Sequence, residues 1–432
     1  MQRIRISANK RHFVLEDGTP FFWLADTAWE LFHKLTPEET LFYLDQRAAQ
    51  GFNVIQAVVL AELDGINSPN ANGEKPLLNA NPEQPNEAYF RPIDAVIRSA
   101  ASRGLYIGLL PTWGDKVNKR YEWAAGPEIF NESNAYVYAH FLACRWRGEP
   151  NITWILGGDR NPDDRAEAIW RAMARGIIAA DAEAVISFHP QPADGGSSSA
   201  WFHDEDWLGF NMLQTGHDRY TPVFEAITRD YERQPGKPVL NGEPTYEAHP
   251  LSFHVSNGYS TAADIRRDAY LSVLAGACGH TYGCHSIWQF HTGEGPGVNH
   301  PLLEWREALQ LAGARQMNYL RRLMLSHAPL KRIPATDLLA GTDPGSARDR
   351  IIAARADDGS YALVYTAAGR KITLLGDVLA GVSLEACWMD PRDGTCTSPQ
   401  TIPKMPRMEF TPPGDGFGDG QGADWVLIIR AT

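Results

Sequence analysis

Two acidic residues stand at the ends of short apolar runs, and their positions suggest paired chemistry. Asp159 follows the run over 152–156 and two glycines, and Glu243 follows the run over 238–240 and an Asn-Gly pair. Glycine lets the backbone bend sharply and lets a ligand approach it closely. Two carboxyl groups that flank one glycosidic bond can cleave it, because one protonates the leaving oxygen while the other attacks the anomeric carbon or activates water. The pair therefore predicts glycosidase chemistry.

Other polar and aromatic residues stand at or just after the ends of further apolar runs. Amide and carboxylate groups bind sugar hydroxyls, and an indole ring stacks on the apolar face of a sugar. The candidate substrate-binding residues are Asp26, Trp113, Asp115, His189, Gln214, Trp288 and Gln289. Roles in packing or in turns remain open for Asp26 and for the two tryptophans, so their assignment depends on their placement at strand ends.

The histidines raise the alternative of a metal site. No HExxH or HxH spacing occurs among His189, His217, His280 and His285, and a catalytic zinc needs three convergent ligands with an open position. We therefore expect no metal and no cofactor, with a zinc hydrolase kept as a minor alternative. A GxxxxGK[ST] loop and a Gly-x-Ser-x-Gly elbow are both absent from the sequence. A non-catalytic carbohydrate-binding protein is the alternative from another functional class.

The apolar runs recur eight times and alternate with segments of helical period. They lie near residues 21–26, 53–59, 105–110, 152–156, 185–188, 208–213, 238–243 and 279–288. Continuous apolar strands between amphipathic helices indicate a parallel sheet covered on both faces. Eight such units predict a (β/α)8 TIM barrel, in which function concentrates at the C-terminal ends of the strands. Strands four and seven would place Asp159 and Glu243 opposite each other across the barrel mouth.

The predicted barrel is irregular in its loops and helices. Residues 60–90 form a polar insertion, and residues 190–206 have little helical period, so a loop is expected in place of the fifth helix. A helix is expected from about Pro92 to Ser102, and a long one from about Pro301 to Met324. Since loops at the barrel mouth carry specificity, the two irregular segments are where substrate choice would be set.

Beyond about residue 328 the helical period gives way to short alternating segments. Examples are Tyr361–Tyr365 and Trp425–Ile429, which are separated by turns such as Asp357-Asp358-Gly359. Strands at this spacing without helices predict a small all-β sandwich. We therefore expect a barrel domain over 1–328, with an N-terminal β-hairpin over about 1–20, and a β-sandwich domain over 329–432. The hairpin is expected to cap the barrel floor or to join the sandwich.

Composition limits the partners and the location of the chain. The sequence has 40 Lys and Arg against 52 Asp and Glu, a formal net charge of −12, which disfavours a nucleic acid partner. Five cysteines are too few, and odd in number, for a disulfide framework.

No run approaches the ~18 apolar residues of a membrane span. With no signal peptide visible, we expect a cytoplasmic protein, or a secreted or periplasmic one if the N-terminus was trimmed. Carbohydrate is the expected partner.

Four segments of the predicted barrel resemble the apiosidase-like glycoside hydrolases, family 140. They are FWLADTAW at 22–29, WILGGDRNP at 154–162, GEPTYE at 242–247, and GHTYG at 279–283 with SIWQ at 286–289. The resemblance covers residues 8–325. Proteins of this type also carry a C-terminal β-sandwich named for collagen binding.

The resemblance implies a mechanism and a substrate class. It implies retaining hydrolysis by double displacement, with Asp159 as the acid/base and Glu243 as the nucleophile. Members of the family act on apiose linkages in the pectic polysaccharide rhamnogalacturonan II, so an apioside in a pectic oligosaccharide is the expected substrate. Another specificity on the same barrel, such as that of a glucosidase or a mannanase, is the alternative.

Overall fold

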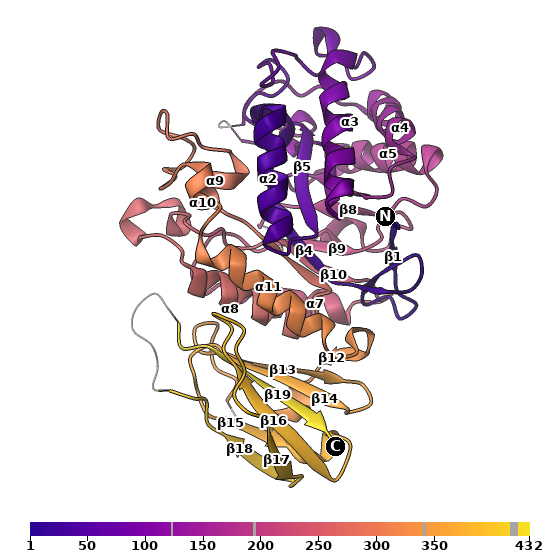
Figure 1. Ribbon diagram of the computed structural model, residues 1–432. Helices are drawn as coiled ribbons and strands as arrows, with labels where there is room; N and C mark the ends of the chain where they lie inside the picture. Colours follow the sequence, from indigo (N-terminus) through magenta and orange to yellow (C-terminus); the bar gives the residue numbers. More distant parts are fainter. Residues whose placement is uncertain (122–123, 193–195, 340–342, 415–421) are drawn as a thin grey trace.

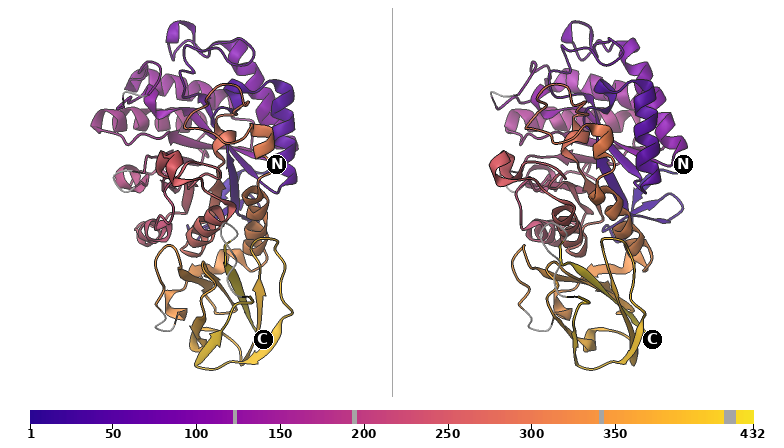
Figure 2. Two further views of the ribbon diagram at one scale, coloured as in Figure 1. Left: turned by 90° about the vertical axis from the view of Figure 1, so that its left-hand side faces the viewer. Right: turned by 60° about the vertical axis from the view of Figure 1, so that its left-hand side comes forward.

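The chain folds into a region of alternating strands and helices followed by an all-β region (Figure 1). The computed structural model describes residues 1–121, 124–192, 196–339, 343–414 and 422–432. The all-β region lies against one side of the first region, beside α8 (Ala262–Leu274) and α11 (Ala312–Leu325), as the views in Figures 1 and 2 agree. None of the helices in the described residues is both long and apolar enough to cross a membrane.

Eight parallel strands form the sheet of the first region, in the order β8-β7-β6-β5-β4-β11-β10-β9. They are β4 (Trp23–Thr27), β5 (Val54–Leu60), β6 (Tyr106–Thr112), β7 (Ile152–Gly157), β8 (Ile186–His189), β9 (Asn211–Gln214), β10 (Val239–Glu243) and β11 (Gly279–Tyr282). The edges β8 and β9 meet where the Gly209 N–H donates to the Ile186 carbonyl at 2.8 Å and Ser187 Oγ donates to the Phe210 carbonyl at 2.7 Å. This near-barrel confirms the predicted fold class.

Helices cover the outside of the sheet between successive strands. The main ones besides α8 and α11 are α2 (Pro37–Ala49), α3 (Glu87–Ser102), α4 (Glu132–Trp146), α5 (Asp164–Ala180) and α7 (Val223–Glu232); short helices are α1 (Leu31–Lys34), α6 (Ser199–Phe202), α9 (His285–Trp288) and α10 (Trp305–Ala308). α2 begins with a capping box, in which Thr36 accepts from the Glu39 N–H and Glu39 accepts from the Thr36 N–H. In the fifth unit, the segment predicted as a loop contains the four-residue α6, and residues 193–195 of that segment lie outside the described part.

Two predicted helix boundaries are wrong. α3 begins at Glu87 rather than near Pro92, because Asn86 caps it and its first turn is held in the core by the buried side chains of Tyr89 and Phe90. The single long helix expected after the eighth strand is divided into α10 and α11. Glu247 accepts a bond from the Gly313 N–H at 3.1 Å and so anchors the start of α11 at an amide that the helix leaves free.

The eighth strand is shorter than the apolar run that predicted it. β11 ends at Tyr282, and the residues from His285 to Trp288 form α9 instead. The barrel interior is filled by side chains of the strands, including Trp23, Ile155 and Met212. The strands therefore form a packed base for the loops at their C-terminal ends, as expected for a (β/α)8 barrel.

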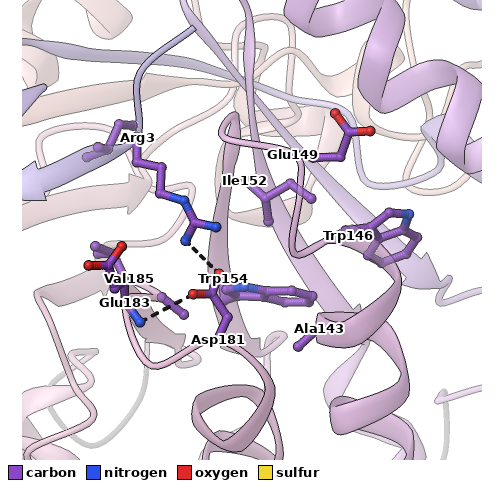
Figure 3. A pocket seen from close by; sticks show the side chains of 11 residues that line it. Arg3, Ala143, Trp146, Glu149, Ile152, Trp154, Asp181, Glu183 and Val185 are labelled. Carbon is purple, nitrogen blue, oxygen red and sulfur yellow. Dashed lines mark hydrogen bonds and ion pairs between the residues drawn. The ribbon is translucent and has the colours of Figure 1, made fainter. Parts of the chain in front are cut away.

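The N-terminal segment covers the floor of the barrel. It forms a three-stranded antiparallel sheet of β1 (Ile4–Ile6), β2 (Phe13–Leu15) and β3 (Pro20–Phe21). Arg3 donates to Asp181 at 2.6 Å across the small pocket in Figure 3, and Arg5 pairs with Glu183 at 2.7 Å. The volume of this pocket is about 10 Å³, which holds no more than a water molecule. This small pocket is therefore not a ligand site.

The C-terminal region consists of two antiparallel sheets. The larger has the order β12-β13-β14-β19-β16-β17, and the smaller pairs β15 with β18. The strands are β12 (Arg332–Pro334), β13 (Ile351–Ala356), β14 (Tyr361–Thr366), β15 (Ile372–Leu375), β16 (Ser383–Met389), β17 (Gln400–Pro403), β18 (Arg407–Phe410) and β19 (Trp425–Ala431). Arg266 of α8 pairs with Asp424 at 2.8 Å, and Tyr270 stacks on Tyr365 with ring centroids 4.9 Å apart. These contacts join the all-β region to the outside of the barrel.

Candidate active site

A pocket of about 680 Å³ lies at the C-terminal ends of the barrel strands. Its volume is within the range of about 300–1,000 Å³ that is usual for small-ligand sites. Three carboxyl groups line it, those of Glu62, Asp159 and Glu243. The remaining lining is largely aromatic, imidazole and amide, and includes Trp29, Trp113, Gln191, Gln214, His217, Tyr246, His249, Phe253, His285 and Trp288. The structure thus brings the two predicted catalytic carboxyl groups into one pocket.

Asp159 is positioned by an unusual stretch of backbone after β7. Gly157, Gly158 and Asp159 have φ values of +86°, +121° and +53°, so three successive residues lie in a region that favours glycine. A Cβ on Gly157 would lie 2.3 Å from the His189 carbonyl oxygen. The Asp159 N–H donates to His189 Nδ1 at 3.2 Å. The two glycines therefore permit the turn that carries the Asp159 carboxyl group into the pocket.

Replacement of Gly158 by Ala is expected to disturb this turn. The new Cβ would lie 2.7 Å from Trp113 Cε3 and 2.9 Å from the Gly114 nitrogen, at a φ that L-residues rarely adopt. We expect a loss of about 1–3 kcal/mol in the free energy of unfolding and a fall in kcat/KM of at least about tenfold from misplacement of Asp159. Urea unfolding and steady-state kinetics measure the two effects.

Gly148→Ala is the matched control for this substitution. A Cβ on Gly148 would meet no atom within 4 Å, and its φ is not in the unfavourable range. It should leave both the unfolding free energy and kcat/KM within experimental error of the wild type. A Gly158→Ala variant that behaves in the same way would show that Trp113 and the backbone yield without cost.

Glu243 ends β10 and is almost completely buried, with 5% of its surface exposed. Its Oε2 lies 2.7 Å from His189 Nε2, and its Oε1 lies 3.5 Å from His217 Nε2. His189 Nδ1 accepts the bond from the Asp159 N–H, so a neutral His189 carries its proton on Nε2, the ring nitrogen that lies beside Glu243. One imidazole thus connects the backbone of Asp159 with the carboxylate of Glu243.

Tyr246 supplies a further polar contact to Glu243. Trp29 Nε1 donates to Tyr246 Oη at 3.0 Å, which leaves the hydroxyl proton of Tyr246 free to be donated. Burial raises the pKa of Tyr246 well above its usual value, and the Glu243 charge with its hydrogen bond raises it further. Tyr246 is therefore protonated at neutral pH and donates to an ionised Glu243.

The surroundings push the pKa values of the two carboxyl groups in opposite directions. Burial and the Glu243 charge raise the pKa of Asp159 to about 6, against the opposing effect of Arg160. Burial would raise the pKa of Glu243 as well, but the contacts from His189 and His217 outweigh it and hold that pKa below its usual range. Two carboxyl groups separated in this way can act as a proton donor and an anion at the same pH.

One wall of the pocket consists of imidazole rings packed against one another. The rings of His217 and His249 are 4.3 Å apart, and those of His249 and His285 are also 4.3 Å apart. Burial lowers the pKa of His249 to about 2 and that of His285 to about 4. His285 Nδ1 accepts from Trp288 Nε1 at 3.2 Å, and its Nε2 lies 2.9 Å from the Asn299 carbonyl oxygen. Around neutral pH, His249 and His285 therefore add aromatic surface without adding positive charge.

The predicted binding residues divide into two groups. Trp113, Gln214 and Trp288 line the pocket, and the buried His189 lies behind it in contact with Glu243. Gln214 also contacts the Asp159 carboxyl group, which slightly opposes the rise in its pKa. The Gln214 Oε1 atom is buried and has no hydrogen-bond partner in the described residues. An unpartnered amide oxygen in a pocket is suited to accept a bond from a sugar hydroxyl.

Asp26, Asp115 and Gln289 do not line the pocket, although the sequence predicted that they bind substrate. Asp26 has no exposed surface and lies 2.7 Å from Arg47 Nε. Trp23 and Ala25 of the same strand face the barrel interior, so the alternation of a strand turns Asp26 outwards. Asp115 is buried in an ion pair with Lys116 at 2.8 Å.

Gln289 acts on the pocket through the backbone of its loop. Its Nε2 donates to the carbonyl groups of His285 and Val298 at 3.1 Å each, and its Oε1 accepts from the Val298 N–H at 2.8 Å. These three bonds hold the loop that places His285 and Val298 on the pocket wall. Gln289 is therefore a positioning residue.

Several pocket residues were missed because they lie beyond the strand ends. They are Trp29, Glu62, Gln191, His217, Tyr246, His249, Phe253 and His285. Tyr246 is only three residues beyond Glu243, and Glu62 is two residues beyond β5, so a wider window after each strand would have found both. Within the described ranges, no three His, Cys, Asp or Glu residues gather in a way that could hold a metal ion.

Comparison with known proteins gives matches over nearly the whole chain. A family described as "Apiosidase-like, catalytic domain" matches residues 7–331, and one described as "Putative collagen-binding domain of a collagenase" matches residues 333–430. A search of curated proteins finds no match.

Solved structures resemble the chain over both regions. One described as a glycoside hydrolase is 33% identical, with a TM-score of 0.89, and the match covers 100% of this chain and 97% of that one. A glycoside hydrolase family 5 protein from Bacteroides vulgatus ATCC 8482 is 32% identical, with a TM-score of 0.90, over 99% of this chain and 93% of that one. An exo-beta-1,4-mannosidase from Opitutaceae bacterium strain TAV5 shares the fold at 15% identity, with a TM-score of 0.55, over 75% of this chain and 63% of that one.

Proposed function

Because the chain belongs to the apiosidase-like family of glycoside hydrolases, we propose that it cleaves an apiose linkage in a pectic oligosaccharide with retention of configuration. That it is a glycoside hydrolase of the family 5-like barrel type follows from the family and from its solved relatives. The substrate is proposed from the activity that names the family. The mechanism is proposed from the two carboxyl groups of the pocket.

The opposite pKa shifts of Asp159 and Glu243 are the observation that carries the mechanism. The low pKa of Glu243 keeps this carboxylate ionised, as an attacking group must be, and the raised pKa of Asp159 keeps it protonated in mildly acidic solution. In the first step Glu243 attacks the anomeric carbon while Asp159 protonates the departing oxygen. In the second step the ionised Asp159 takes a proton from water, and this water releases the sugar from Glu243.

The contacts around Glu243 fit the role of nucleophile. His189, His217 and Tyr246 all contact its carboxyl group, so its orientation is held before substrate binds. Among the residues that the structure describes, the Asp159 carboxyl group has fewer such contacts, with Arg160 at 3.0 Å and with Gln214. Asp159 is also more open, with 21% of its side chain exposed against 7% for Glu243. A general acid/base needs this access, because water must reach it in the second step.

The pH dependence of kcat/KM is expected to follow the ionisation of these two groups. Since Asp159 must be protonated to act as the acid, kcat/KM should fall by about tenfold for each pH unit above about 6. The acidic limb should lie below the usual range of a glutamate, because Glu243 stays ionised to unusually low pH. Initial rates at low substrate concentration between pH 4 and 8 measure the profile, and circular dichroism verifies that the fold persists. A rate that rises through pH 6 would contradict the assignment.

Product stereochemistry and a substrate panel test the proposal directly. During hydrolysis of an apiosyl oligosaccharide, proton NMR should first show the sugar with the anomeric configuration of the substrate. The opposite anomer as first product would indicate inversion and remove the nucleophile role of Glu243. Hydrolysis of aryl glucosides or mannosides without hydrolysis of apiosides would leave the barrel chemistry in place and overturn the proposed substrate.

A further inference from the structure

Glu62 is a third carboxyl group of the pocket that the double displacement does not use. It lies two residues beyond β5 and lines the pocket together with Asp159 and Glu243. Its carboxyl group has no hydrogen bond or ion pair within the described residues. The described lining contains no Lys or Arg. A carboxyl group that reaches a ligand pocket without a protein partner is available to bind the ligand.

The backbone after Glu62 is strained in a way that presents this residue. Leu63 and Asp64 have φ values of +42° and +64°, and both are non-glycine residues. The Gly65 N–H closes the turn by donating to the Glu62 carbonyl at 2.8 Å. Two successive left-handed residues cost free energy, and such strain is concentrated at functional sites. Leu63 lines the pocket as well, so the strained turn forms part of its wall.

The surroundings of Glu62 favour its protonated form. Burial raises the pKa of Glu62 well above its usual value, and the nearby charges of Glu30, Asp159 and Asp115 raise it further, while Arg160 opposes them. Glu30 is fully buried, and neither of its carboxyl oxygens has a hydrogen-bond partner in the described residues. Burial likewise raises the pKa of Glu30 to about 7. A protonated carboxyl group can donate a hydrogen bond, which an ionised one cannot.

We propose that the protonated Glu62 is a substrate-binding residue, which donates a hydrogen bond to a hydroxyl group of the sugar beside Asp159 and restricts this position to uncharged sugars. The proposal rests on the proposed function, because it assumes that a sugar occupies the pocket. A uronic acid would bring its carboxylate next to the ionised Glu243 and the carboxyl groups of Asp159 and Glu62. Without a cationic side chain in the described lining, that charge would be desolvated and unpaired.

Two substitutions of Glu62 test the hydrogen bond. Glu62→Ala removes the donor and should raise KM by about 10–100-fold, because a buried sugar hydroxyl is left without a partner. Glu62→Gln keeps the size and an uncharged donor, and should recover most of that loss. Glu83→Ala and Glu83→Gln are the controls, since Glu83 is an exposed residue of the same insertion, and both should match the wild type. A Glu62→Ala enzyme with unchanged KM, or a Glu62→Gln enzyme as impaired as Glu62→Ala, would overturn the proposal.

Calorimetric titration tests the restriction to uncharged sugars without turnover. The Glu243→Gln protein is titrated with methyl glycosides of neutral sugars, apiose among them, and with those of uronic acids. At least one neutral glycoside should bind at least about tenfold more tightly than any uronide, and Glu62→Ala in the same background should weaken its binding by a similar factor. Equal or tighter binding of a uronide, or no effect of Glu62→Ala on binding, overturns the inference. An enzyme that hydrolyses no apioside overturns the proposed substrate instead, so the two failures are distinguishable.

Discussion

The Glu243→Gln enzyme is expected to lose at least about 10⁴-fold in kcat/KM. The amide has almost the shape of the carboxylate but cannot form the glycosyl-enzyme bond, so the first step of the double displacement is lost. Steady-state hydrolysis of an apiosyl oligosaccharide measures this loss. Glu232→Gln is the matched control, because Glu232 is exposed at the end of α7 and should give wild-type rates.

Chemical rescue separates loss of the nucleophile from loss of the fold. In a Glu243→Gly enzyme, added azide can occupy the vacated space and attack the anomeric carbon in place of the carboxylate. The expected product is a glycosyl azide of inverted configuration, identified by NMR. Wild-type rates in Glu243→Gln, or a rescue product of retained configuration, would show that Glu243 is not the nucleophile.

The Asp159→Asn enzyme is expected to show a loss that depends on the leaving group. Asparagine cannot protonate the departing oxygen, so kcat/KM should fall by about 10²–10⁴-fold for a sugar leaving group. An acidic phenol needs little protonation as it leaves an aryl glycoside. For such a substrate, the rate of the glycosylation step should therefore fall far less. The decline of kcat/KM above pH 6 should also disappear, because it reports the ionisation of Asp159 itself.

The comparison of two leaving groups can also contradict the role of Asp159 as proton donor. Equal losses for sugar and activated aryl leaving groups would mean that Asp159 is not the proton donor and that its substitution merely distorts the pocket. Asp206→Asn is the control, since Asp206 is exposed on the outside of the barrel and should leave both rates unchanged. Thermal unfolding of both variants verifies that the fold is retained.

His189 explains why the Asp159 and Glu243 environments depend on each other. Its Nδ1 accepts from the Asp159 N–H, and its Nε2 lies 2.7 Å from Glu243. The backbone turn that presents Asp159 therefore also selects the tautomer of His189 that favours an ionised Glu243. Sequence alone ranked His189 as a substrate-binding residue at the end of its strand, but the imidazole is buried and faces Glu243 instead.

Local sequence patterns were sufficient to predict the fold class. Apolar runs, helical periods and capping signals such as Thr36 to Glu39 depend on neighbours in sequence, and they led to the eight strands and to most of the helices. The undivided helix predicted after the eighth strand was wrong because a distant residue intervenes. The first turn of α11 is anchored by Glu247, which lies 66 residues before Gly313 and accepts its N–H, and no local pattern contains that bond.

In the candidate site as well, local sequence patterns predicted some residues and not others. The positions of Asp159 and Glu243 at the ends of strands four and seven were readable, because parallel strands of a barrel end at one mouth. The outward orientation of the Asp26 side chain could not be predicted, because a single apolar run does not reveal which face of the strand meets the barrel interior. The place of Glu62 in the pocket could not be predicted either, because it depends on a strained turn within a polar insertion.

Strand order, the pairing of carboxyl groups and the chemistry they permit were thus present in the residues and their spacing. The division of labour between the two carboxyl groups was not, because a pKa depends on burial and on neighbours in space. His189, His217 and Tyr246 come from three different loops or strand ends, and their convergence on Glu243 belongs to the tertiary structure, as do the lowered pKa of Glu243 and the raised pKa of Asp159.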